Sequence, residues 1–262
     1  MNQVLDKIRE VIRTNQNIVL LSGSEVTKET GLNGIRAEHI AYDIEQKYGY
    51  SSDEIVSSLF LSRSVETFYD YYRNIILNKS DVELTKVHRA AAKLEEEGKL
   101  TAVITKAVYG HFEQAGCKNV VELYGSAEEN RCPVCGRFYD SKFIKESHNA
   151  PKCVDCEVVL RPGFSLYGEM IDNGRLTKAS NAIEYADVLI VAGTSLNSLS
   201  WANTIRYYGG DKLILINTEE KSGDERADFR AYGNLSEIFA YITDLDKESP
   251  GSPQTEEEKT DK

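Results

Sequence analysis

Four cysteines are the residues of this chain whose type and spacing most directly indicate chemistry. They form two Cys-x-x-Cys pairs, Cys132 with Cys135 and Cys153 with Cys156, separated by residues 136–152. Each pair places two thiolates on one tight turn, and two such turns form a tetrahedral site of the kind that Zn²⁺ prefers. Four thiolates leave no open position for water or substrate. We therefore predict a structural zinc site that stabilises the fold and takes no part in catalysis.

A pair of disulfides is the alternative interpretation of the same cysteines. Two-residue loops make poor disulfide rings, and disulfides persist mainly in oxidising compartments. The first ten residues contain charges and no apolar segment, so no export signal is visible. These observations favour zinc and predict a reducing, cytoplasmic setting. The fifth cysteine, Cys117, is expected to be a small core residue.

Length and charge exclude several classes of function. The chain has 262 residues and a formal net charge of −11 at pH 7. Binding to a phosphate backbone needs a basic face, so we expect no nucleic-acid partner. The longest apolar runs, such as 18–21 and 188–192, are far shorter than the ~20 residues of a membrane helix. We therefore expect no membrane span.

The pattern of apolar residues predicts an α/β fold. Short runs rich in β-branched residues and leucine indicate buried strands at 17–22, 100–105, 119–123, 187–192 and 212–217. Helical patterns lie at 4–13, 85–97, 176–185, 200–208 and 235–242. The alternation of strand and helix predicts a parallel sheet with helices on both faces.

Two segments interrupt this alternation. One, 125–160, contains the cysteine pairs, and the other, 37–80, is helical and has an aromatic cluster formed by Phe68, Tyr69, Tyr71 and Tyr72. Packing inside a small helical subdomain explains this cluster better than a cofactor site does. The final segment, 246–262, has no apolar face, and we expect an acidic, disordered tail.

The first predicted strand ends in the sequence LSGSEVTKETG, at the edge of the sheet where ligands of parallel sheets bind. A phosphate-binding loop usually has two or three glycines, but this turn has only Gly23 before the helix. By spacing alone, a nucleotide site and a plain strand–helix turn are equally consistent with it.

Several motifs together resemble the sirtuin family. LLSGSEVTKETGLNGIR is similar to L-T-G-A-G-x-S-x-x-S-G-I-P-D-F-R, and ITKAVYGHFEQAG is similar to I-T-Q-N-I-D-x-L-H-x-x-A-G. ELYGS, close before the first cysteine pair, resembles E-L-H-G-S before the family's zinc cysteines. LRPGFSLYGE, VLIVAGTSL and LILIN resemble R-P-x-V-V-x-F-G-E, V-x-G-T-S-L and the nucleotide-side I-N. The motifs keep the family's order from about residue 1 to residue 245.

The resemblance implies a Rossmann-like NAD-binding domain formed by residues 1–36, 81–124 and 161–245. It also implies a small second domain, made of the helical insertion 37–80 and the zinc-binding module 125–160. In the cleft between these domains, sirtuins transfer an acyl group from lysine to the ADP-ribose of NAD and release nicotinamide. The expected ligands are therefore structural Zn²⁺, NAD or ADP-ribose, and an acylated or other protein partner.

The family's general-base histidine corresponds to Tyr124 in this chain. Histidine is largely a free base at neutral pH, whereas a phenol ionises near pH 10 and is about one part in a thousand anionic. This difference corresponds to about 4 kcal/mol, too much for an efficient general base. Tyr124 is the candidate catalytic residue, with two roles left open. It could donate a hydrogen bond to a ribose or a carbonyl, or it could plug a vacated cleft.

Other departures from the family fall on the nicotinamide end of the site. The Q-N-I-D positions are residues 106–109 with the sequence KAVY, so the amide and the carboxylate are both absent. Glu25 replaces a glycine of the loop and brings a negative charge toward the pyrophosphate position. At about 5 Å and an effective dielectric constant near ~20, two like charges repel by roughly 3 kcal/mol. This would weaken cofactor binding unless Glu25 points away or pairs with Arg36.

The ribose and phosphate side of the site, by contrast, is retained. By resemblance, the expected cofactor-binding residues are Gly23, Thr27, Arg36, Thr105, Gly193, Thr194, Ser195 and Asn217. We therefore predict a divergent sirtuin with a degenerate active site, a nucleotide-binding pseudoenzyme whose NAD-dependent protein deacylation is impaired or lost. An ADP-ribosyltransferase and a weak NAD-dependent deacylase are the alternatives.

Overall fold

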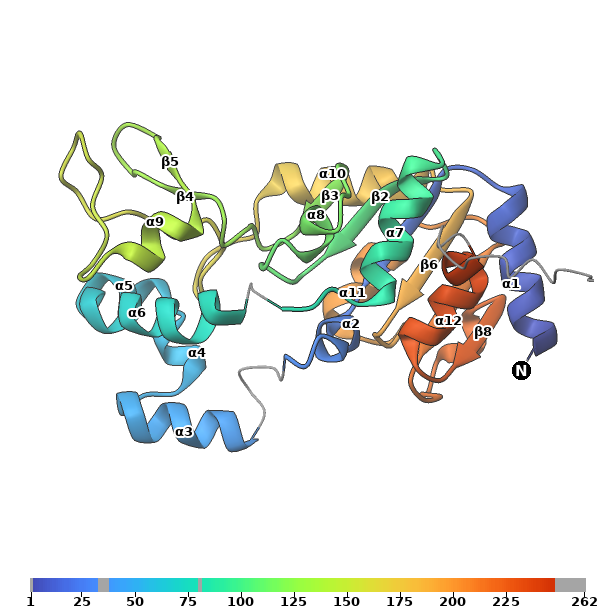
Figure 1. Cartoon of the computed structure of the whole chain (residues 1–262), viewed down its shortest axis with the longest axis horizontal. Coiled ribbons are helices and arrows are strands. Elements are labelled where there is room, and N and C mark those ends of the chain that lie inside the picture. Colours follow the sequence, from blue (N-terminus) through green and yellow to red (C-terminus); the bar gives the residue numbers. More distant parts are fainter. Residues whose placement is uncertain (1, 33–37, 80–81, 248–262) are drawn as a thin grey trace, which may run out of the picture.

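The computed structural model describes residues 2–32, 38–79 and 82–247 (Figure 1). Arg36, one of the predicted cofactor-binding residues, lies outside this part of the chain, and so does the predicted tail from residue 248 onward. No helix within the described ranges combines the length and the apolar character that crossing a membrane requires.

A six-stranded parallel sheet forms the larger part of the molecule. Its order is β3-β2-β1-β6-β7-β8, which confirms the predicted fold class. The strands are β1 (Ile18–Ser22), β2 (Leu100–Thr105), β3 (Val120–Glu122), β6 (Val188–Ala192), β7 (Leu213–Asn217) and β8 (Phe229–Tyr232). In the centre of the sheet, Leu20 pairs with Val103 on one side and with Ile190 on the other. Every residue of β1 and β6 is buried, because helices cover both faces of these strands.

Helices pack on the two faces of this sheet (Figure 1). One face is covered by α1 (Asn2–Thr14), α7 (Lys86–Glu96) and α12 (Leu235–Ile242). The other face is covered by α10 (Asn173–Glu184) and α11 (Leu199–Ile205). We call the sheet with these helices the sheet lobe.

The amphipathic pattern of α7 illustrates why these segments are helical. Val87, Ala90, Ala91 and Leu94 recur at three- and four-residue spacing and are all buried against the sheet. The chain turns away after the helix at Gly98, whose φ of 72° lies in the left-handed region that favours glycine. The apolar stripe and the glycine together set the position and the end of this helix.

A second, smaller group of elements lies at the opposite end of the molecule from α1 (Figure 1). It contains the helices α3 (Glu38–Tyr48), α4 (Ser52–Ile55), α5 (Ser58–Arg63) and α6 (Val65–Tyr71), followed by a π-helical turn, Tyr72–Ile76, and a 3₁₀ turn, Leu77–Lys79. It also contains the strand pair β4 (Asn130–Arg131) and β5 (Phe138–Tyr139) and the helix α9 (Ser141–Glu146). We call this group the small lobe. The predicted domain boundaries stay a prediction.

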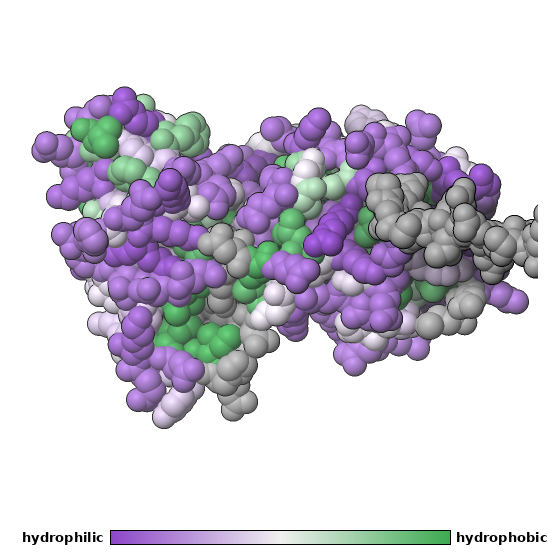
Figure 2. Space-filling model, viewed as in Figure 1, coloured by the Kyte–Doolittle hydropathy of each residue, from purple (hydrophilic) through white to green (hydrophobic). Residues whose placement is uncertain are grey.

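The helical part and the cysteine-containing part of the small lobe share one hydrophobic core. Phe68, Tyr69, Tyr71 and Tyr72 are completely buried in this core, so their role is packing, as predicted. The hydroxyl of Tyr72 lies 2.9 Å from Asn130 Oδ1 and 3.1 Å from the carbonyl oxygen of Ala127. The Tyr72 hydroxyl thus connects the helical part of the small lobe to the β4–β5 segment by hydrogen bonds. Figure 2 shows a largely hydrophilic face around both lobes, with apolar surface near their junction.

The buried hydroxyl of Tyr72 predicts a measurable effect on stability. Replacing Tyr72 by Phe should lower the free energy of unfolding by about 1–2 kcal/mol, because Asn130 loses a buried hydrogen-bond donor. Denaturant unfolding of the zinc-loaded protein measures this change. Tyr42→Phe is the matched control, since the Tyr42 side chain is 63% exposed and its change should stay below about 0.5 kcal/mol. Equal free energies of unfolding of the two variants would contradict a stabilising role of the Tyr72–Asn130 hydrogen bond.

Candidate functional site

The carboxyl ends of β1 and β6 form the centre of the candidate site. The chain leaves β1 in one direction along the sheet and β6 in the other, which makes this edge the switch point where ligands of open parallel sheets bind. The backbone N–H of Gly23, directly after β1, donates to the carbonyl oxygen of Ala192 at 2.8 Å. A Cβ atom at Gly23 would lie 2.4 Å from both the Gly193 oxygen and Thr194 Cβ. Only glycine therefore allows these two loops to meet.

A cavity of about 300 Å³ opens beside this contact. Of the predicted cofactor-binding residues, Gly23, Thr27 and Thr194 line it. Thr27 belongs to α2 (Ser24–Glu29), the short helix that follows β1. The lining also includes two lysines, Lys28 and Lys106. The cavity thus combines hydroxyl groups with two positive charges.

The other described residues of the predicted set lie at the same edge of the sheet and shape its loops. The Thr105 hydroxyl accepts a hydrogen bond from the Ala107 N–H at 3.1 Å, and the Ser195 hydroxyl accepts one from the Asn197 N–H at 3.1 Å. Gly193 follows β6 with a φ of 68°, a conformation that favours glycine. Their present contacts are with the protein backbone rather than with the cavity.

Asn217, at the end of β7, has a polar atom that a ligand could satisfy. Its Nδ2 donates to the carbonyl oxygen of Thr194 at 3.0 Å. Its Oδ1 is buried and has no hydrogen-bond partner within the described part of the chain. Buried polar atoms are normally paired, so an acceptor left open at this edge fits a ligand with hydroxyl groups. The residues present are therefore compatible with a ribose-containing cofactor.

Glu25 does not line the cavity, although the sequence placed its charge near the phosphate position. Its carboxylate accepts hydrogen bonds from Lys221 Nζ at 2.8 Å and from the Thr218 hydroxyl at 3.0 Å. Burial opposes ionisation of Glu25, but the hydrogen bonds from Lys221 and Thr218 outweigh it and hold the pKa of the carboxyl below its usual value. Glu25 is thus anionic and tied to the loop after β7, with Lys221 as its cation.

A second cavity, of about 600 Å³, lies next to the first and contains Tyr124. Tyr124 follows β3 and does not line the smaller cavity. Its carbonyl oxygen accepts a hydrogen bond from the Ser165 N–H at 2.6 Å, which joins it to the returning segment of the small lobe. Lys106 and Tyr109 line both cavities and form the wall between them. Tyr124, the predicted catalytic residue, therefore lines a cavity next to the one lined by Gly23, Thr27 and Thr194.

Lys106 is a functional candidate that the sequence indicated only as a replacement of the family's glutamine. It follows β2 directly, and its Nζ lies 3.9 Å from the ring centroid of Trp201 in α11. Burial lowers the pKa of Lys106 to about 8. The signal that could have indicated this contact is the single tryptophan of the chain, placed shortly after the glycine–threonine–serine turn at 193–195.

Buried polar groups hold the loop that carries Lys106 and Tyr109. The Gly110 N–H donates to Glu122 Oε1 at 3.2 Å, and the ring of Tyr109 stacks on that of His111 at 5.4 Å. Burial raises the pKa of Glu122 to about 8, so this carboxyl is mostly protonated at neutral pH. Its position next to the wall of the cleft makes Glu122 a positioning residue for this loop.

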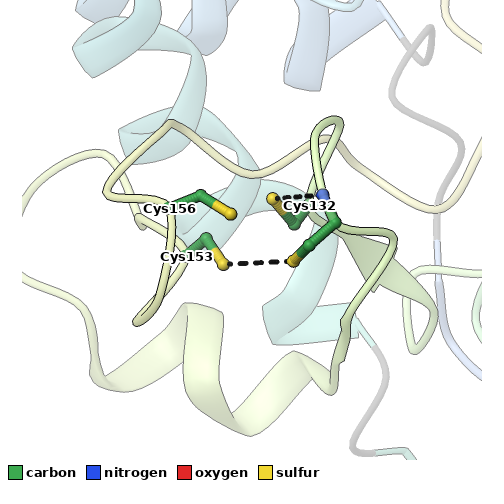
Figure 3. A group of neighbouring side chains, drawn as sticks. Cys132, Cys153 and Cys156 are labelled. Atoms are coloured by element: carbon green, nitrogen blue, oxygen red, sulfur yellow. Dashed lines mark hydrogen bonds between the residues drawn. The ribbon is translucent and has the colours of Figure 1, made fainter.

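The four predicted metal ligands come together in the small lobe (Figure 3). The Sγ atoms of Cys132, Cys135, Cys153 and Cys156 all lie within 4.8 Å of one another, and none of these residues lines either cavity. The four-thiol donor set and the two tight turns fit Zn²⁺. Among the described residues, no other group of histidine, cysteine or acidic side chains is arranged to hold a metal ion.

The four thiols influence one another's ionisation. A hydrogen bond from the Tyr139 hydroxyl, at 3.2 Å, lowers the pKa of Cys153 to about 6. The hydrogen bond with Cys135 raises the pKa of Cys156 to about 12. Four thiols this close cannot all ionise unless a cation compensates their charge, and zinc would do so.

Comparison with known proteins identifies the family. Residues 23–200 match a family model described as the Sir2 family. The chain belongs to this family. This sirtuin is 35% identical over 245 residues to a protein from Clostridium perfringens named NAD-dependent protein deacetylase, a match that covers 93% of this chain and 100% of the relative.

Solved structures of Sir2 proteins have the same fold as this sirtuin. The crystal structure of a Sir2 homologue in complex with NAD superposes with a TM-score of 0.78 at 28% identity, over 92% of this chain and 93% of the other. A Sir2 protein with one histidine exchanged for tyrosine, solved with a p53 peptide and NAD, has a TM-score of 0.75 at 26% identity, over 93% and 98% of the two chains.

The cysteine cluster predicts that metal removal loosens the small lobe of this sirtuin. Metal analysis of the purified protein should find about one zinc per chain. Cys153→Ser should lower the zinc content several-fold and make residues 38–79 sensitive to protease, because Cys153 belongs to the core shared with the helices. Cys117→Ser is the control, since Cys117 is buried in the sheet lobe and should leave the zinc content unchanged. A protein that is folded and protease-resistant without metal would contradict the structural role.

Proposed function

We propose that this sirtuin binds NAD or ADP-ribose at the switch point and that its NAD-dependent lysine deacylation is impaired or lost. The observation that carries the proposal is the contrast between the two halves of the cleft. The turn at Gly23, with Thr27 and Thr194, forms a cavity suited to a pyrophosphate and a ribose. Lys106 and Tyr109 form the wall between the two cavities, and Tyr124 lines the second cavity.

The side chains around the smaller cavity support nucleotide binding. Two lysines line the smaller cavity, together with the hydroxyls of Thr27 and Ser24. At the end of β7, on the same edge of the sheet, Asn217 Oδ1 has no hydrogen-bond partner among the described residues. Because Lys221 and Thr218 hold the Glu25 carboxylate, the repulsion that the sequence predicted would be reduced. The relatives support the same ligand class, since one solved Sir2 homologue is a complex with NAD.

The impairment is supported by the absence of a suitable base. Deacylation by the family uses a histidine as general base on the ribose hydroxyls, and this chain has Tyr124 at that position. A phenol is a poor proton acceptor at neutral pH, so the step that needs a base would be slow. Binding does not need that base. In a Sir2 protein with one histidine exchanged for tyrosine, both NAD and a p53 peptide were present in the structure.

The second cavity is the proposed place for a protein partner. The segment of Phe164 and Ser165 lines it, and the ring of Phe164 packs against that of Tyr72 with centroids 5.4 Å apart. This contact links the wall of the cavity to the small-lobe core. An acylated or another extended peptide would lie along this segment, and zinc, by holding the small lobe, would keep the wall in place.

The proposal predicts very low deacylase activity. Zinc-loaded protein with NAD and lysine peptides of several acyl chain lengths should form O-acyl-ADP-ribose at least about a hundredfold more slowly than the Clostridium perfringens relative assayed in parallel. Tyr124→His alone should not restore activity, since the wall residues also differ from the family. Appreciable deacylation by the unmodified protein or by this single variant would overturn the impairment. Nicotinamide release without acyl transfer would favour an ADP-ribosyltransferase instead.

The ion pair of Glu25 predicts a separate effect on nucleotide binding. Lys221→Met should weaken binding of ADP-ribose by about tenfold, because the released carboxylate can approach the phosphate position. Glu25→Gln combined with Lys221→Met should restore the affinity, and Lys221→Arg should keep it. Calorimetric titration measures each constant. Unchanged affinity of Lys221→Met for ADP-ribose would show that the Glu25 carboxylate does not repel the ligand's phosphates.

A further inference from the structure

The helix α2 forms part of the wall of the smaller cavity, although its own sequence holds it only weakly in place. Thr27 and Lys28 of this six-residue helix line the cavity. Of the six residues, all within the described part of the chain, only Val26 is buried. Glu25 and Glu29 are four residues apart, and two like charges at this spacing destabilise an isolated helix. A helix this short does not persist alone, so contacts with other elements must hold it.

The Glu29 carboxylate makes such a contact at the start of α12. Its Oε1 accepts a hydrogen bond from the Leu235 N–H at 2.7 Å, and its Oε2 accepts from the N–H of Ser236 at 3.1 Å and from the Ser236 hydroxyl at 2.6 Å. These are the first two residues of α12, whose N–H groups have no partner inside the helix. The positive end of the helix dipole also favours a carboxylate there. One side chain thus joins α2 to a helix that starts 206 residues later.

Glu25 and Glu29 attach the same face of α2 to two different elements. Residues four apart lie on one face of a helix. Glu25 is bound to Lys221, in the loop after β7, and Glu29 is bound to α12. Neither carboxylate is among the described residues that line the smaller cavity, whereas Thr27 and Lys28 are. The two charges that would repel each other in a free helix therefore each have a separate partner, and the rest of the helix is left to form the wall.

We infer that Glu29 is a positioning residue of the nucleotide site, an inference that rests on the proposed function. Its contact with α12 keeps α2 where Thr27 and Lys28 line the cavity. A ligand binds only to molecules in which this wall is assembled, so the apparent affinity falls with the population of that state. The coupling is reciprocal, because a ligand that fixes α2 must also strengthen the contact of Glu29 with α12.

Substitutions at Glu29 test this role by calorimetric titration of the zinc-loaded full chain with ADP-ribose. Glu29→Ala should weaken binding by about tenfold, as expected if the wall is assembled in only about a tenth of the molecules. Glu29→Gln keeps the length and one acceptor oxygen and should recover most of this affinity. Glu237→Ala is the matched control, because it removes an exposed acidic side chain from the first turn of α12 without touching α2. It should leave the affinity unchanged. Zinc content and circular dichroism verify that each variant is folded.

Hydrogen exchange of the unmodified protein, measured by NMR, gives a readout that a merely structural role would not change. Saturating ADP-ribose should slow the exchange of the Leu235 and Ser236 amides by at least about threefold, although neither residue lines the cavity. The Phe143 amide, which the Asp140 side chain caps in the small lobe at 2.8 Å, is the control and should exchange at the same rate with and without the ligand. In Glu29→Ala the effect at Leu235 and Ser236 should disappear.

Each outcome separates this inference from the proposed function. Full affinity of folded Glu29→Ala for ADP-ribose would overturn the positioning role and leave the nucleotide site standing. Bound ADP-ribose that does not slow exchange at Leu235 and Ser236 would overturn it as well. Equal losses of affinity in Glu29→Ala and Glu237→Ala would assign the effect to the stability of α12 and overturn the role of the contact. No binding of ADP-ribose or NAD at millimolar concentration by the unmodified protein would overturn the proposed function and this inference with it.

Discussion

The contact between the loops that follow β1 and β6 is the constraint on which the rest of the site depends. At Gly23 no side chain fits, because a Cβ atom would lie 2.4 Å from the Gly193 oxygen. This close approach brings two turns together at the switch point of the sheet and aligns Thr27 and Thr194 along one cavity. The central strands are buried on both faces, so the backbone beneath the contact cannot move to relieve a clash. The sheet topology places the cleft at this edge, and Gly23 allows its two loops to meet there.

Around that contact, an acidic side chain and two lysines occupy separate positions. Glu25 lies next to the turn but is bound to Lys221, which lies beyond β7. Lys106 and Lys28 face the cavity instead. Two lysines thus line one cavity in a protein whose formal net charge is −11. Local side-chain positions, rather than total charge, therefore set the electrostatic character of this cavity.

The small lobe shapes the other half of the cleft through packing. Cys132 and Cys153 lie in the same hydrophobic core as the aromatic cluster, and Tyr72 contacts both Asn130 and the ring of Phe164. A metal bound by the cysteines would therefore support the wall of the second cavity from a distance. A structural ion that has no open coordination position can thus affect the shape of a cavity that it does not line.

The sequence by itself determined the sheet, its covering helices, the aromatic core and the grouping of the four cysteines, because buried strands, amphipathic stripes and paired cysteines are local patterns. It missed β8, whose four residues, FRAY, include a charge and pair only with β7 at the edge of the sheet. It identified Glu25 and the residue at 106 as departures from the family, but not the contacts that these side chains make. Only the tertiary structure paired Glu25 with Lys221 and set Lys106 against Trp201 between two cavities. These partners lie far apart in the chain, and the direction of a long charged side chain is decided by the neighbours that folding brings to it.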